Sequence, residues 1–129
     1  MSALTFYRRV TEETGEADRA AVKRGTAAVL HALRDRLTPA EAAHAAAQLP
    51  SELKAVWWAG EVRDRRPIKM HRKKLYERVM REAGLENVRD ARFLTIGVFT
   101  ALKAQISSGE AADVWAQLPQ DLQDVWDEA

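Results

Sequence analysis

Two short segments of the chain carry potential metal ligands three positions apart, a carboxylate with an imidazole in one and two carboxylates in the other. Glu41 and His44 lie three positions apart, and so do Glu110 and Asp113. On a helix, this spacing places both side chains on one face, and paired E-x-x-H motifs hold di-iron centres in helical bundles. Such a centre needs a second E-x-x-H motif and two further inward-facing carboxylates, which the sequence does not offer.

Each of the two glutamates has a simpler explanation in the residues before it. The segments Thr38-Pro39-Ala40-Glu41 and Ser107-Ser108-Gly109-Glu110 both match a capping box. In this motif the hydroxyl accepts a hydrogen bond from the glutamate N–H, and the glutamate side chain accepts one from the N–H of the capping residue. We therefore expect Glu41 and Glu110 to face the starts of their helices, and we predict no metal site and no cofactor.

The remaining composition excludes several enzyme classes. The chain has no cysteine, which excludes thiol catalysis, disulfides and cysteine-ligated metals. Its six glycines are scattered and form no phosphate-binding loop. No serine, aspartate or second histidine lies at a recognisable triad spacing from His31, so we expect an ordinary half-buried or surface position for it on a helix. We predict that the protein is not an enzyme and binds no small molecule.

One segment near the middle of the chain is strongly basic. Overall, 20 lysines and arginines face 19 aspartates and glutamates, so the net charge of +1 indicates no general attraction to nucleic acid or membranes. Between residues 63 and 74, a single aspartate opposes Arg63, Arg65, Arg66, Lys69, Arg72, Lys73 and Lys74. Acidic residues gather near the C-terminus, at Asp121, Asp124, Asp127 and Glu128.

Three interpretations of this basic segment stay open. It is a solvated linker, a contact for an acidic protein surface such as the C-terminal acids of another copy, or a weak and salt-dependent site for nucleic-acid phosphates. No aromatic residue lies within it, and no helix-turn-helix signature accompanies it. Base-specific recognition is therefore not expected.

The chain also repeats itself at an offset of about 69 positions. Residues 6–60 align without a gap on residues 75–129. The densest match is Ala47-Gln48-Leu49-Pro50 against Ala116-Gln117-Leu118-Pro119, each preceded by Glu-Ala-Ala and followed by Leu-x-x-Val-Trp. Self-similarity at a fixed offset indicates two copies of one structural unit.

The repeat divides the four tryptophans into two pairs. Trp57 and Trp126 occupy equivalent positions, so we expect both in the core. Trp58 and Trp115 have no tryptophan partner in the other copy. Because tryptophan is enriched at binding hot spots, these two are candidates for a partner surface, and the alternative is that they fill the seam between the copies.

Both copies predict the same four helices, at about 4–14, 18–37, 38–49 and 50–58 and again 69 positions later. Gly15 and Gly84 follow the first helix of each copy as left-handed terminators. Residues 93–100 alone resemble a strand, but the equivalent residues 25–32 are rich in alanine, so we predict helix for both. The fold class is all-α: an internally duplicated bundle of about eight helices in two four-helix repeats with approximate two-fold pseudosymmetry. Residues 1–129 form one domain, with repeats at about 4–60 and 73–129 joined by a basic segment at about 61–73.

The duplicated E-A-A-x-x-x-A-Q-L-P-x-x-L-x-x-V-W pattern resembles the bacterial domain-of-unknown-function family numbered 2267. The resemblance extends from about Leu4 to Trp126 and implies a duplicated helical fold without implying an activity. No signal peptide or membrane span is recognisable, so we expect a cytoplasmic protein. We predict a non-catalytic protein–protein interaction or self-association module, with sequence-independent nucleic-acid binding through the basic segment as the alternative.

Overall fold

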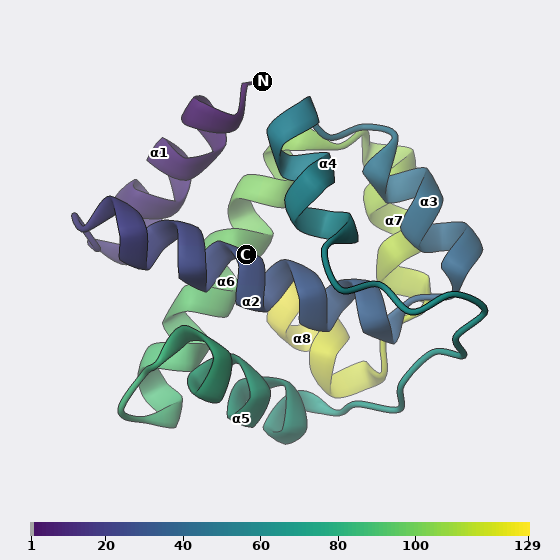
Figure 1. Cartoon of the computed structure of the whole chain (residues 1–129). Coiled ribbons are helices and arrows are strands. Elements are labelled where there is room, and N and C mark those ends of the chain that lie inside the picture. Colours follow the sequence, from purple (N-terminus) through teal and green to yellow (C-terminus); the bar gives the residue numbers. More distant parts are fainter. Residues whose placement is uncertain (1) are drawn as a thin grey trace.

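The computed structural model describes residues 2–129, and every regular element in this range is an α-helix (Figure 1). In chain order the helices are α1 (Ala3–Thr14), α2 (Arg19–Arg36), α3 (Pro39–Ala46), α4 (Ser51–Trp58), α5 (Arg72–Ala83), α6 (Val88–Gln105), α7 (Ser108–Ala116) and α8 (Gln120–Glu128). The predicted all-α class with about eight helices is confirmed. The two-fold pseudosymmetry stays a prediction.

Local signals set the helix ends. Asp18 accepts hydrogen bonds from the backbone N–H groups of Ala20 and Ala21, and Asn87 accepts one from Asp90. These side chains satisfy N–H groups that have no partner inside the helix. Gly15 and Gly84 end α1 and α5 with φ values of 75° and 68°, a backbone region that favours glycine. The strand-like residues 93–100 lie inside α6.

Two long helices, α2 and α6, contact each other in the middle of the molecule. The first helix α1 packs mainly against α6, and α5 packs mainly against α2 (Figure 1). The first helix of each half of the sequence therefore packs against the long helix of the other half. As a result, buried side chains from all eight helices join in one hydrophobic core.

Trp57 and Trp126 lie in this core, as predicted. Trp57 is fully buried, and its indole N–H donates to the backbone oxygen of Ala42 at 3.1 Å. Trp126 packs against Phe99 with 5.0 Å between the ring centroids. Each tryptophan packs the last short helix of its half of the sequence, α4 or α8, against the rest of the fold.

Candidate functional site

The basic segment, residues 61–74, runs from the end of α4 past the C-terminal end of α2 and into α5 (Figure 1). Arg65 donates hydrogen bonds to the backbone oxygens of Arg34, Asp35 and Leu37, at 2.6, 3.3 and 2.7 Å. The N–H of Ile68 donates to the oxygen of Asp35 at 2.8 Å. These bonds satisfy the last carbonyl groups of α2 and fix the segment on the fold.

Arg65 consequently serves the structure instead of a binding surface. Its side chain is only 8% exposed and pairs with Glu61 at 2.7 Å. The end of α2 buries the Arg65 side chain and supplies its carbonyl acceptors. Spacing in the sequence does not predict this tertiary neighbour. Arg65 therefore leaves the set of candidate binding residues.

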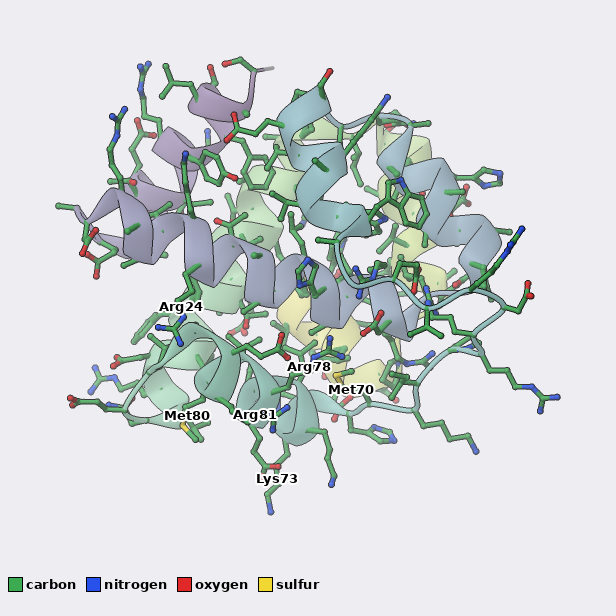
Figure 2. The ribbon with its side chains drawn as sticks, viewed as in Figure 1. Arg24, Met70, Lys73, Arg78, Met80 and Arg81 are labelled. Carbon is green, nitrogen blue, oxygen red and sulfur yellow. The ribbon has the colours of Figure 1, made fainter. Side chains whose placement is uncertain are left out.

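The other predicted cations of the segment are exposed. Among residues 2–129, none of them forms an ion pair with another side chain. Figure 2 shows Lys73 extending away from α5. Two apolar side chains of the same segment, Val62 and Ile68, are also exposed. The exposed cations are Arg63, Arg66, Lys69, Arg72, Lys73 and Lys74.

Trp58 and Trp115 are both 38% exposed. Trp58 is the last residue of α4 and directly precedes the basic segment in the chain. Trp115 lies on α7, where its backbone oxygen accepts a hydrogen bond from Gln123 of α8. Trp58 therefore adjoins the basic segment in the chain, whereas Trp115 lies on a different helix.

The first acidic residue of α8, Asp121, contacts the end of the basic segment in space. Asp121 accepts a hydrogen bond from the N–H of Arg72 at 3.0 Å and lies 3.4 Å from Nδ1 of His71. Partial burial opposes ionisation of Asp121, but these two donors outweigh it and lower its pKa. Asp124 and Asp127 are exposed, and Glu128 pairs with Arg92 at 2.8 Å. Charges of opposite sign therefore lie beside each other on one molecule.

A buried ion-pair network lies beneath the basic segment. Arg34 is almost fully buried and donates to Asp35 at 2.9 Å and to the backbone oxygens of Trp57 and Ala59. Arg78 of α5, which Figure 2 labels, donates to the other oxygen of Asp35 at 2.8 Å. Burial disfavours the ionised form of Asp35, but the hydrogen bonds from the two arginines dominate and lower its pKa. This network joins α2, α4 and α5, and no spacing in the sequence predicts it.

In both copies, the capping-box prediction is correct for the hydroxyl of the cap residue and wrong for the glutamate side chain. The hydroxyls of Thr38 and Ser107 accept from the N–H groups of Glu41 and Glu110, as expected. The N–H of Thr38, however, donates to the side-chain oxygen of Gln117 at 2.9 Å. Likewise, the N–H of Ser107 donates to Gln48 at 2.6 Å. The glutamines of the two A-Q-L-P motifs thus reach across and take the place predicted for the glutamates.

Glu41 and Glu110 meet at the contact between α3 and α7 instead of facing the helix starts. Each residue is only 7% exposed. Burial first, and then the neighbouring Glu41 and the charge of Asp113, raise the pKa of Glu110 to about 7. Spacing in the sequence makes both glutamates candidate metal ligands, but the capping motifs assign them to the helix caps. Their equivalent repeat positions were a usable signal that they meet, because equivalent residues come together where equivalent helices pack against each other.

His31 occupies the half-buried helix position that was expected. Its Nε2 forms a hydrogen bond of 2.5 Å with the backbone oxygen of Val56.

Within residues 2–129, no helix has both the length and the apolar character needed to cross a membrane.

The fold and its surfaces thus define an all-helical protein with one shared core and a fixed basic segment beside an acidic helix. Residues 4–125 match the family model described as Uncharacterized conserved protein (DUF2267), and the chain therefore belongs to this family. No curated protein matches the chain.

Proposed function

We propose that the chain is a non-catalytic interaction module that associates with a second copy of itself. The surface we assign to this association consists of the basic segment, Trp58 and the exposed acids of α8. The observation that carries the proposal is the position of Asp121, whose contacts with His71 and Arg72 place the start of α8 against the end of the basic segment.

Two-fold symmetry explains why adjacent patches of opposite charge suit self-association. In a symmetric dimer the same surface of both copies meets itself. A surface with cations beside acids is then self-complementary, because the basic patch of one copy faces the acidic patch of the other. Asp121 and Asp124 are three positions apart on α8 and so lie on one side of that helix, next to the basic segment.

Exposed apolar side chains supply binding energy that surface ion pairs alone do not provide. Ion pairs between exposed residues contribute about 0–1 kcal/mol each, which does not hold a dimer together. Trp58, Val62 and Ile68 are exposed along the same stretch of chain as the cations. Tryptophan and arginine are enriched at protein interfaces, so this mixture of residue types supports protein association over binding of phosphates alone.

Charge reversal tests the proposal directly. Sedimentation velocity of the unmodified chain should detect a dimer at low salt that dissociates as salt rises. The variants Lys73→Glu/Lys74→Glu and Asp124→Lys/Asp127→Lys should each be monomeric, and their equimolar mixture should form a heterodimer. Arg8→Glu/Arg19→Glu changes exposed cations on α1 and α2 and serves as the matched control. A monomer at every salt and protein concentration would refute self-association.

Binding of nucleic-acid phosphates is the second candidate, favoured by exposed cations of the basic segment that have no acidic partner within residues 2–129. A labelled duplex should then bind at low salt, with an affinity that falls steeply as salt rises. Duplex binding by a chain that stays monomeric, abolished in Lys73→Glu/Lys74→Glu, would replace the first candidate by the second.

A further inference from the structure

The contact between α3 and α7 gathers three groups that can ligate a metal ion. In Figure 1 these two short helices lie side by side. Glu41, His44 and Glu110 each offer one ligand atom, and these atoms lie within 4.8 Å of one another. The separation of Nδ1 of His44 from Oε2 of Glu41 is 3.7 Å.

The two glutamates present polar atoms that the protein leaves without a partner. Oε2 of Glu41 and Oε2 of Glu110 are both buried and accept no hydrogen bond from another residue in the described chain. No lysine or arginine between residues 2 and 129 pairs with either carboxylate. A buried charged group without a compensating partner is costly, so this pair needs a proton or a cation between its oxygens.

We propose that Glu41, Glu110 and His44 form a binding site for one divalent transition-metal ion, such as Zn²⁺. Two carboxylate oxygens and one imidazole nitrogen make a donor set that zinc accepts, with water in the remaining position. An imidazole ligand and so few oxygens disfavour Ca²⁺ and Mg²⁺, which prefer oxygen ligands in larger number.

The three ligand atoms, which lie within 4.8 Å of one another, must move closer together to bind such an ion. Bonds of about 2.0–2.1 Å to a tetrahedral zinc ion place neighbouring ligand atoms about 3.4 Å apart. The separation of 3.7 Å between Nδ1 of His44 and Oε2 of Glu41 is close to this value. The His44 side chain is 70% exposed and can rotate toward the two buried glutamates.

The surrounding structure holds the glutamates where the ion needs them. The N–H groups of Glu41 and Glu110 are bound by Thr38 and Ser107, and the ends of α3 and α7 are joined by the crossed glutamine bonds. Support of this kind around metal ligands increases metal affinity. A carboxylate of α7, Asp113, adds negative charge beside Glu110.

Isothermal titration calorimetry of the whole chain with Zn²⁺ tests the site, and Mg²⁺ serves as the comparison ion. We expect one equivalent of Zn²⁺ to bind and to raise the thermal unfolding temperature, and Mg²⁺ to do neither. His44→Ala should weaken zinc binding about tenfold or more, and Glu110→Gln should abolish it. His71→Ala is the matched control, because it removes the exposed histidine that pairs with Asp121 and should leave zinc binding unchanged.

The variants also define what would overturn the proposal. His44→Ala changes an exposed side chain, so its fold is expected to persist even if Glu110→Gln fails to fold. Absence of zinc binding, or zinc binding that His44→Ala leaves unchanged, would overturn the proposed site of Glu41, His44 and Glu110. Loss of zinc binding in His71→Ala would assign the ion to the surface pair.

Discussion

Replacement of Glu110 by glutamine should stabilise the protein at alkaline pH when metal is removed by a chelator. The pKa of Glu110 is raised from 4.5 to about 7, first by burial and then by Glu41 and Asp113. A carboxyl whose pKa is higher in the folded state than in the unfolded state favours the fold when protonated. Its contribution is therefore lost as pH rises from about 4.5 through about 7.

The size of this effect follows from the same shift. One pKa unit corresponds to about 1.4 kcal/mol, so ionisation of Glu110 costs the fold on the order of 3 kcal/mol at about pH 8. Glutamine has nearly the same shape, carries no charge and can donate a hydrogen bond to Glu41. We expect Glu110→Gln to raise the free energy of unfolding by about 1–3 kcal/mol at about pH 8, and to change it little near pH 4–5.

Urea unfolding followed by tryptophan fluorescence, with chelator present at both pH values, measures the difference. The substitution Glu12→Gln on the exposed side of α1 is the control and should change stability at neither pH. An equal effect of Glu110→Gln at both pH values, or a loss of stability at alkaline pH, would contradict the inferred repulsion between the two glutamates. With Zn²⁺ in place of the chelator, only the unmodified chain should gain stability.

Three further substitutions test the fold. Trp57→Ala should cost about 3–5 kcal/mol in urea unfolding, because it empties a fully buried position and removes the hydrogen bond to Ala42. Asp35→Asn should cost about 1–3 kcal/mol near neutral pH, since it removes the nearer counter-charge of buried Arg34 and leaves only Glu61, 3.8 Å away, to pair with it. The lowered pKa of Asp35 means that its contribution is present above about pH 4 and is lost as pH falls further, so the variant and the unmodified chain should converge in acid-unfolding curves. Gln117→Ala should cost about 1–3 kcal/mol by leaving the N–H of Thr38 without an acceptor, whereas Gln120→Ala, on the exposed start of α8, should be neutral.

Comparison of the two halves made the helices predictable where one copy alone was ambiguous. Residues 93–100 would be assigned to a strand from their β-branched and aromatic content, yet they lie in α6 as their alanine-rich counterparts predicted. The burial of Trp57 and Trp126 was predictable for a similar reason, since both copies keep tryptophan on an apolar helix face.

The candidate surface was predictable only in part. Residue types identify the basic segment, and most of its cations are indeed exposed. Arg65 belongs to the same segment as the exposed cations and is equally basic, but its guanidinium is buried against the end of α2. Composition does not distinguish a cation that faces solvent from one that caps a helix from a distant part of the chain.

Sequence alone predicted the helix order, most helix starts and the burial of Trp57 and Trp126, because caps and apolar spacing act within a few residues. The ends of α3 and α7 were predicted too far along the chain, at about 49 and 118, whereas the helices end at Ala46 and Ala116. Tertiary structure decided the fate of Glu41 and Glu110. The competitor for the cap N–H of Thr38 is Gln117, which lies 79 positions away, and local spacing contains no information about such a neighbour. Once the glutamines occupy both cap positions, the two glutamates are left to face each other across α3 and α7, where burial and their mutual repulsion create the most unusual chemistry in the molecule.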